Sequence, residues 1–365
     1  RQQQLGILKK FVRLPKPIWK NSKQSKGCRH MGKVVTLGEI MLRLSTPVGI
    51  RVAQTENFAV HYGGGEANVA ISLANYGHQV TFASKVPDNS LGEAAKKHLS
   101  RYGVSTEFVR TGGTRLGTYY LETGTGERAA SVVYDRAYSS FAQIEEMEWD
   151  LHELFSGVEI FHISGITAAL SKNWQSMTVA LVKAAKQAGC QVSFDINYRG
   201  KLWSQKEASV ALKAILPFVD ICSAGVLDAR YLLEIPEPEE ELEDALTWYY
   251  RKMQERYPNI QVFYSTKRQV HSATDNELIG TLWYKGAYYT SKCHRLQPIV
   301  DRVGAGDAFA GGVLHGILAA YDPQTCIDFA TAASALKHTV HGDCNQFSQK
   351  EVLAFLATGS GKINR

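Results

Sequence analysis

Asp301-Arg-Val-Gly-Ala-Gly-Asp307 is a glycine-containing stretch, and the small apolar run Ala308-Phe-Ala-Gly-Gly312 follows it. Gly304 and Gly306 have no Cβ, so the backbone there can turn sharply and approach a ligand closely. The pattern predicts a helix over about 307–320, whose free N–H groups and dipole attract anions. A carboxylate in its first turn can accept a proton from a hydroxyl. The stretch therefore predicts phosphoryl transfer to an alcohol or, more simply, a helix cap after a tight turn.

A second stretch, Gly63-Gly-Gly-Glu-Ala-Asn-Val-Ala70, lies far upstream. The two stretches resemble, in order, the C-terminal D-x-x-G-A-G-D signature and the N-terminal glycine–asparagine signature of the ribokinase-like (PfkB) carbohydrate kinases. The resemblance extends from about Met31 to about Leu356. It implies an α/β fold, a ribokinase-like three-layer αβα sandwich with a mainly parallel central sheet and a small β-sheet lid. We therefore expect one carbohydrate kinase domain over residues 31–360.

The same resemblance implies roles for individual residues, with ATP and Mg²⁺ as cofactors. The catalytic loop corresponds to Gly304, Ala305, Gly306 and Asp307, with Asp307 as the base. Sugar contacts are expected from Gly64, Gly65, Asn68, Tyr119, Tyr134, Arg136, Asn197, Arg199 and Asp307. Nucleotide contacts are expected from Ser223, Asp228, Thr266, Gly304 and Gly306, and a metal contact from Asp228.

The net charge of +6 comes from the first thirty residues, which contain nine Lys or Arg and no Asp or Glu. Without them, 32 basic residues stand against 35 acidic ones, a net charge of −3. The basic excess therefore predicts no nucleic-acid surface. We expect residues 1–30 to lie outside the fold, either as a targeting or membrane-contacting segment or as sequence read from upstream of a start at Met31.

Composition predicts a cytoplasmic globular protein. Hydrophobic residues make up 44% of the chain and charged residues 21%, and no apolar run is long enough to span a membrane. None of the six cysteines forms a C-x-x-C pair or a zinc spacing. Cys190 and Cys222 fall in apolar runs, which fits buried thiols in a reducing compartment.

Apolar periodicity predicts alternating strands and helices, the pattern of a parallel sheet covered on both faces. Strands are expected over 33–39, 79–86, 158–163, 191–196, 219–222 and 260–264. Helices are expected over 66–76, 90–102, 171–188, 205–216, from the acidic stretch 237–243 to 257, and from 307 to about 356. Ranges 42–62 and 106–137 instead indicate short strands and hairpins, which would form the β lid.

Polar residues follow the strand at 191–196, where ligands of such sheets bind. Asp195-Ile-Asn-Tyr-Arg199 is either a substrate site or a self-bonded polar turn. Alternation places Tyr134 and Arg136 on one face of a strand, which is either a binding face or a solvated one.

Several short patterns resemble 2-keto-3-deoxygluconate kinases within the family: Thr36-Leu-Gly-Glu39, Tyr119, Tyr134-x-Arg136, His162-Ile-Ser-Gly165-Ile and Asp195-x-Asn-Tyr-Arg199-x-x-Leu-Trp203. The resemblance implies that Tyr119, Tyr134, Arg136 and Arg199 hold a sugar acid. Guanidinium groups suit a planar carboxylate, which agrees with this assignment.

Two departures from the family pattern fall in the nucleotide half. Gly225 and Asp228 stand where the family has N-x-x-E, and Lys267 and Val270 replace a glycine pair. These changes bear on donor affinity and metal handling and leave the sugar-acid residues intact.

Together these features predict a kinase that phosphorylates the terminal hydroxyl of 2-keto-3-deoxygluconate with ATP and Mg²⁺. No G-x-x-x-x-G-K-[ST] motif occurs, which excludes a P-loop kinase. The alternatives are a fructokinase or other neutral-sugar kinase, and a catalytically weak sugar-acid-binding protein. Besides a sugar acid and ATP we expect no nucleic acid and no membrane as partners, and the family resemblance suggests a homodimer through the β lid.

Overall fold

The computed structural model describes residues 31–239 and 244–358, so the basic leader and residues 240–243 of the acidic stretch lie outside the described residues. A ten-stranded sheet crosses this part of the chain in the order β13-β12-β11-β10-β9-β8-β1-β4-β5, with β14 paired to β12. Its strands are β1 (Lys33–Leu37), β4 (Gln79–Val86), β5 (Val109–Thr111), β8 (Ile160–Ser164), β9 (Gln191–Asp195), β10 (Ile221–Ser223), β11 (Val262–Ser272), β12 (Asp275–Tyr284), β13 (Ala287–Thr290) and β14 (His294–Leu296). Pairing is parallel from β5 through β11 and antiparallel from β11 to β14.

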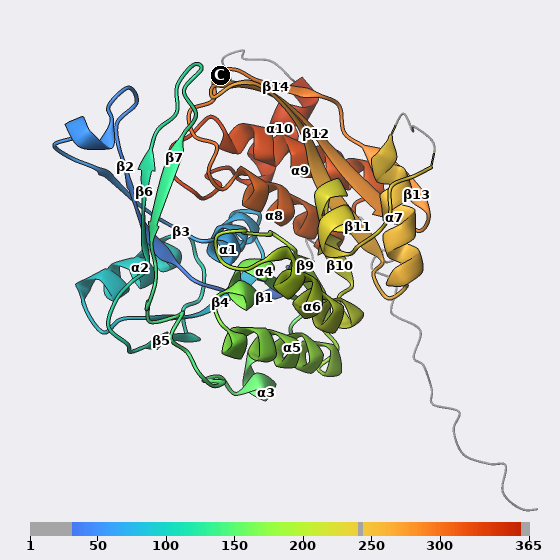
Figure 1. Cartoon of the computed structure of the whole chain (residues 1–365), viewed down its shortest axis with the longest axis horizontal. Helices are drawn as coiled ribbons and strands as arrows, with labels where there is room; N and C mark the ends of the chain where they lie inside the picture. Colours follow the sequence, from blue (N-terminus) through green and yellow to red (C-terminus); the bar gives the residue numbers. More distant parts are fainter. Residues whose placement is uncertain (1–30, 240–243, 359–365) are drawn as a thin grey trace, which may run out of the picture.

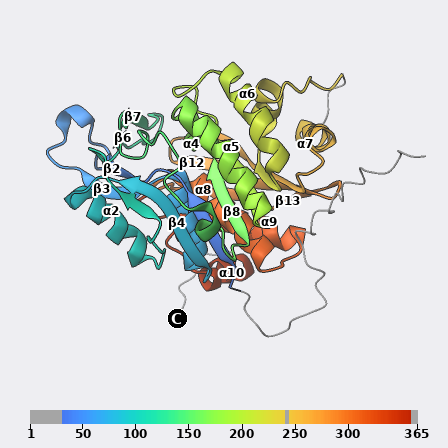
Figure 2. The same ribbon diagram turned by 90° about the horizontal axis from the view of Figure 1, so that it is seen from below.

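Helices cover both faces of this sheet, which confirms the predicted three layers (Figures 1 and 2). Successive side chains of a strand point to opposite faces, so Val34 and Val35 of β1 enter different cores. Val34 packs in a core with α1 (Gly65–Asn75), α2 (Ser90–Arg101), α8 (Ala305–Leu318) and α9 (Pro323–Lys337). Val35 packs in a core with α3 (Leu151–Leu154), α4 (Gly165–Ala169), α5 (Lys172–Gln187), α6 (Gln205–Ile215) and α7 (Ala245–Arg256).

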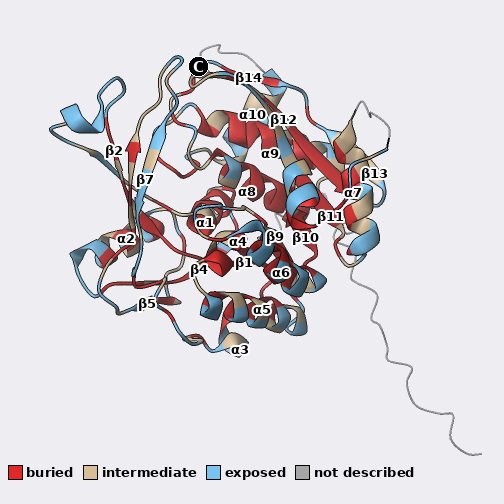
Figure 3. Ribbon diagram, viewed as in Figure 1, coloured by how far each residue is buried: buried red, intermediate tan, exposed pale blue. Residues whose placement is uncertain are grey.

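Short helical elements and a terminal helix complete the described chain. The 3₁₀ turns are Val52–Gln54 and Leu216–Phe218, a π-helical turn spans Asp228–Leu232, and α10 (Gln349–Thr358) packs on α9. Figure 3 shows buried residues along the central strands and α8, with exposed residues on the outer sides of α5 and α6. Within residues 31–239 and 244–358, no helix is both long and apolar enough to cross a membrane.

A second, four-stranded sheet stands beside the body of the molecule (Figure 1). Its order is β3 (Ala59–Gly63), β2 (Met41–Ser45), β6 (Thr118–Glu122) and β7 (Ser131–Asp135). These strands fall in the two ranges predicted to form the β appendage. The prediction is wrong for the start of the second range, because β5 pairs with β4 in the large sheet and buries Val109 in its core. A strand of three residues is too short to show an alternation signal.

Two further differences concern the C-terminal half. β11 continues eight residues past Tyr264, to Ser272, and pairs with β12, so Lys267 and Val270 lie in a strand and not in a loop. The predicted continuous helical region after α8 is also wrong, because a non-helical segment over 338–348 separates α9 from α10. That segment contains Asp343, which contacts the signature loop described next.

Candidate active site

The non-helical part of the C-terminal signature, residues 301–304, is called the signature loop. It ends at Gly304, which caps α8 in the left-handed conformation at φ 78°. A Cβ at this position would lie 1.7 Å from the carbonyl oxygen of Asp343, so glycine is required there for two reasons. Within the described chain, the backbone N–H groups of Gly304, Gly306 and Asp307 have no hydrogen-bond acceptor. Unpaired amides at a helix N-terminus attract anions, and the sequence predicts an anion site here.

The two signatures meet at Asp307. Asn68 of α1 donates a hydrogen bond from Nδ2 to Asp307 Oδ2 at 2.7 Å. A Cβ on Gly65 would lie 3.8 Å from Asp307 Oδ1, so this residue leaves room beside the second carboxylate oxygen. Gly64 packs so closely on the Glu39 backbone that a Cβ would stand 1.9 Å from the carbonyl oxygen. The N-terminal signature therefore forms one wall around the carboxylate of the C-terminal one.

The pKa of Asp307 is raised to about 7, mainly by burial and then by the negative charges of Asp195 and Glu66. The hydrogen bond from Asn68 and the charge of Arg199 act in the opposite direction. As a whole residue Asp307 is half-buried. A carboxyl group with this pKa accepts a proton at neutral pH far better than an ordinary aspartate.

Two more carboxylates lie at the carboxyl ends of β9 and β10. Burial raises the pKa of Asp195 to about 6, and the charge of Asp228 adds to the shift. Asp228 Oδ2 accepts from the Gly225 N–H at 2.8 Å, and burial also raises the pKa of Asp228. Asn197 has a positive φ of 40° and donates from Nδ2 to Asp195 Oδ2 at 3.2 Å. This geometry agrees with a polar turn and leaves carboxylates available to a ligand.

Arg199 is exposed and its charge favours ionised Asp195 and Asp307, which places the guanidinium near both. Arg136, in contrast, is ion-paired through Nη2 with Glu39 Oε2. Its Nε is buried and has no partner in the described chain. The structure thus brings Arg199 to the carboxylates and ties Arg136 to the end of β1.

The two predicted sugar-binding tyrosines face each other across β6 and β7. Their ring centroids are 5.6 Å apart, and Tyr134 is 46% exposed. Tyr119 is buried, and its hydroxyl donates to Asp343 Oδ2. Tyr134 is thus open to a ligand, whereas the Tyr119 hydroxyl is engaged within the protein.

The predicted nucleotide residues divide into two groups. Ser223 ends β10 and hydrogen-bonds Asp195, so it belongs with Asp195 and Asp228. Thr266 is exposed in β11 opposite Gly280. Next to it, Lys267 is neutralised by Asp244, with Nζ 2.5 Å from Oδ2.

Sequence reasoning missed a buried ion cluster behind the signature loop, made of Arg43, Asp301, Asp343 and Lys337. Arg43 of β2 contacts Asp301 Oδ2 at 2.6 Å and Asp343 Oδ1 at 2.5 Å. Lys337 of α9 is fully buried and donates to the Asp301 carbonyl oxygen at 3.1 Å. The sequence of β2 could have revealed the cluster, because the alternation Met41-Leu-Arg-Leu-Ser45 places Arg43 at an inward position.

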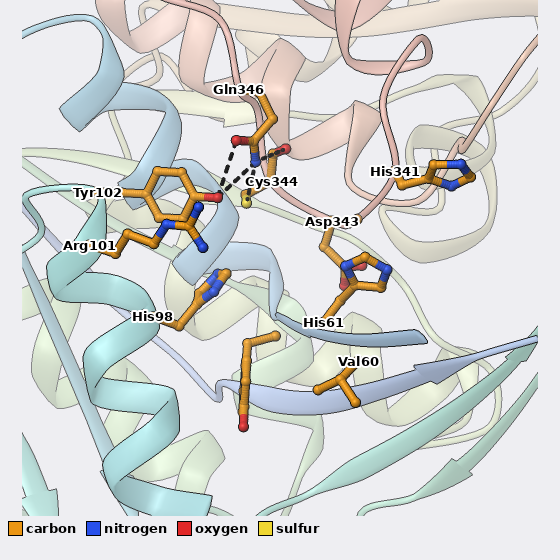
Figure 4. A pocket seen from close by; sticks show the side chains of 11 residues that line it. Val60, His61, His98, Arg101, Tyr102, His341, Asp343, Cys344 and Gln346 are labelled. Atoms are coloured by element: carbon orange, nitrogen blue, oxygen red, sulfur yellow. Dashed lines mark hydrogen bonds between the residues drawn. The ribbon is translucent and has the colours of Figure 1, made fainter. Parts of the chain in front are cut away.

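Two cavities flank this ion cluster. One, of about 390 Å³, lies between β3, the end of α2 and the segment after α9, with His61, His98 and Asp343 in its wall (Figure 4). The other, of about 580 Å³, is lined by Arg43 and Asp301 among others. Neither cavity includes Asp307 or Arg199 in its lining. The carboxylate site, made of Asp195, Asp228 and Asp307, is therefore distinct from both cavities.

No three His, Cys, Asp or Glu side chains of the described residues form a ready-made metal site. Asp195 and Asp228 are two desolvated carboxylates in mutual repulsion, which suits a cation held jointly with a ligand. They fit Mg²⁺ shared with phosphate groups, since this ion commonly takes only one or two protein carboxylates.

Comparison with known proteins agrees with this geometry. The profile of the pfkB family carbohydrate kinases matches residues 31–350. A 2-dehydro-3-deoxygalactonokinase of Haloferax volcanii is 32% identical over 335 residues, which cover 91% of this chain and 99% of that protein. A PfkB family carbohydrate kinase structure from Listeria grayi is 49% identical with a TM-score of 0.86, covering 89% of this chain and 99% of that one. The 2-dehydro-3-deoxygluconokinase structure from Thermotoga maritima is 39% identical with a TM-score of 0.87, covering 90% and 99%.

Proposed function

The chain belongs to the pfkB family of carbohydrate kinases, and from this premise we propose that it transfers the γ-phosphoryl group of ATP to the terminal hydroxyl of 2-keto-3-deoxygluconate or a close sugar acid. The observation that carries the proposal is the contact between Asn68 and Asp307, because it joins the N-terminal and the C-terminal signature at one carboxylate. The names of the relatives from Haloferax volcanii and Thermotoga maritima support a 2-keto-3-deoxy sugar acid as the acceptor.

The proposed mechanism follows from the positions of the donors and acceptors. Asp307 Oδ2 is engaged by Asn68, which leaves Oδ1, beside Gly65, to take the proton from the attacking hydroxyl. The free N–H groups of Gly304, Gly306 and Asp307 stabilise charge on the transferred phosphoryl group. Asp195 and Asp228 would hold Mg²⁺, which neutralises charge on the donor phosphates when bound.

Recognition of the acid group is assigned first to Arg199. Within the described chain it has no carboxylate in ion-pair contact, whereas Arg136 is paired with Glu39. An unpaired guanidinium can bind a sugar carboxylate without breaking an existing ion pair. We propose that Arg136 and Tyr134 add contacts from the second sheet, which would act as a lid over the sugar.

A coupled assay of ADP release over sugars and sugar acids tests the proposal. We expect turnover of 2-keto-3-deoxygluconate or 2-keto-3-deoxygalactonate and poor turnover of fructose. Arg199→Ala should raise KM for the acid about tenfold or more, since it removes a charge-assisted contact. Lys206→Ala, which removes an exposed charge from α6, is the matched control. Efficient use of fructose, unaffected by Arg199→Ala, would instead identify a neutral-sugar kinase.

Assembly and compartment are further parts of the proposal. Val48, Val60 and Val133 on or beside the second sheet are each more than half exposed, an apolar surface that a second copy of the chain could cover. Light scattering of the parent and a Val60→Lys/Val133→Lys variant would test a dimer through this sheet. The described cysteines form no disulfide, which agrees with a reducing cytoplasm.

A further inference from the structure

Two arginines, one within the signature and one on β11, have no carboxylate in ion-pair contact among the described residues. Arg268 lies on the extension of β11, and Arg302 is the second residue of the signature. Neither forms an ion pair with any carboxylate of residues 31–239 or 244–358. Lys267, next to Arg268 in the chain, differs in this respect because Asp244 neutralises it.

Arg268 is held by a hydrogen bond that fixes its direction. Its Nη1 lies 3.0 Å from His338 Nε2. His338 is buried and its Nδ1 lies 2.6 Å from the Ser334 carbonyl oxygen, so Nδ1 carries the hydrogen and Nε2 accepts from Arg268. Burial and the charge of Arg268 lower the pKa of His338 to about 3, which keeps the ring neutral.

The same histidine connects Arg268 to the signature. The His338 carbonyl oxygen accepts from Val300 N at 2.8 Å and from Asp301 N at 3.3 Å, directly before Arg302. The two guanidinium groups lie close enough to repel each other: burial, and then the charge of Arg302, lower the pKa of Arg268 to about 10. Arg268 therefore remains charged at neutral pH.

This arrangement costs free energy in the ligand-free protein. Arg268 is partly desolvated and faces a like charge without a compensating carboxylate. Arg43 shows the alternative within the same molecule, since its buried guanidinium binds two aspartates. Arg302 stands two residues before Gly304, whose N–H group, like that of Gly306, has no acceptor among the described residues. Such a cationic pair is suited to an anion with several charges.

We propose that Arg268 and Arg302 form a clamp for the polyphosphate of the nucleotide donor. The proposal rests on the proposed kinase function and adds to it the residues that hold the donor. Guanidinium groups bind phosphate oxygens in pairs and need no close backbone approach. The clamp would therefore compensate for Lys267 and Val270, which occupy the positions of the family's glycine pair.

Calorimetric titration of the full chain with ATP, AMP and inorganic tripolyphosphate tests the clamp. We expect Arg302→Gln to weaken binding of ATP and tripolyphosphate roughly tenfold, and that of AMP much less, because AMP lacks the β- and γ-phosphates. Binding in the parent should weaken more steeply with added salt than in the variant. Arg268→Gln should act in the same direction, and Arg268→Lys should recover part of the affinity if it folds as the parent does.

The controls separate the clamp from general charge effects and from the proposed reaction. Arg295→Gln removes an arginine that is exposed and paired with Asp275, and it should leave all three affinities unchanged. Nucleotide-free Arg302→Gln should be no less heat-stable than the parent, because the change relieves repulsion. Parent-like affinity for ATP and tripolyphosphate in the Arg302→Gln and Arg268→Gln variants, or no polyphosphate binding by the parent, would refute the clamp. Failure to phosphorylate any sugar acid, with the clamp intact, would instead count against the proposed function.

Discussion

Two groups of charged residues include the first and last residues of the signature, Asp301 and Asp307, and differ in how their charges are balanced. In the ion cluster, Arg43 and Lys337 supply positive charge to Asp301 and Asp343, and every one of these side chains is at least 93% buried. In the carboxylate site, Asp195, Asp228 and Asp307 are desolvated, and Arg199 supplies positive charge to Asp195 and Asp307.

This difference indicates that the ion cluster supports the loop and that the carboxylate site takes part in the chemistry. Paired buried charges are costly to disturb, so the ion cluster holds the backbone on which Gly304 sits. Carboxylates with raised pKa values gain free energy when a proton, metal ion or cationic group reaches them. Substitutions in the ion cluster should therefore affect stability, and substitutions in the carboxylate site should affect turnover.

The largest effect is expected for Asp307→Asn. Asparagine has nearly the same shape but cannot act as a base, so kcat should fall about 10²- to 10⁴-fold without a loss of thermal midpoint. In the parent, kcat/KM should rise with pH through about 7, as Asp307 loses its proton. A kcat within about threefold of the parent would remove Asp307 from the mechanism.

Stability provides an independent readout of the same residue. The pKa of Asp307 in the folded protein, about 7, exceeds its ordinary value of 3.8, so between these pH values the folded state binds more protons than the unfolded state. This residue therefore makes the parent less stable as pH rises from about 4 to 7. Asp307→Asn should flatten that part of the stability profile.

Arg43→Met tests the other side of the comparison. It leaves Asp301 and Asp343 buried without their cation, which should cost about 3–5 kcal/mol in the free energy of unfolding. Urea denaturation of the variant measures this loss. Arg51→Met, which breaks an exposed pair with Glu122, is the matched control and should hardly change the midpoint. Equal, small effects of both changes would mean that the ion cluster does not support the loop.

Asn68→Ala should move the pH profile of turnover. The amide of Asn68 stabilises ionised Asp307, so its loss should raise the pKa of that carboxyl group. The midpoint of kcat/KM should shift upward by about one to two pH units, because a charge-assisted hydrogen bond contributes roughly 1.5–3 kcal/mol. The profile of the Ser72→Ala variant, altered one turn along α1, should match that of the parent. A downward shift would contradict the assigned hydrogen bond.

The smallest effect is expected for Tyr119→Phe. The change removes the hydroxyl that donates to Asp343 and should reduce stability by about 1–2 kcal/mol. KM for the sugar acid should change little if the hydroxyl serves the ion cluster. Tyr120→Phe, next in β6 and oriented to the opposite face, is the control. A large rise in KM without loss of stability would show instead that Tyr119 binds the sugar, which is the role that the sequence resemblance implies.

Local patterns in the sequence were sufficient to predict most of the α/β alternation. β4 was predicted to the residue because an eight-residue buried strand has a long apolar signal. The strands β12 to β14 were not predicted, because partners along a meander depend on neighbours that a local pattern does not identify. The segment 338–348 was assigned to helix for the same reason, since its contact with Gly304 is a tertiary one.

By itself the sequence determined that a helix begins at the glycine loop of Gly304 and Gly306, with Asp307 in its first turn, because glycine conformation is a local property. Tertiary structure alone decided that Asn68 reaches Asp307 and that Arg43 reaches Asp301 and Asp343. It also decided that Arg199 has no carboxylate in ion-pair contact within residues 31–239 and 244–358, whereas Arg136 is paired. Burial and partnership set the pKa of a charged group and its availability to a ligand, and both arise only when distant segments pack together.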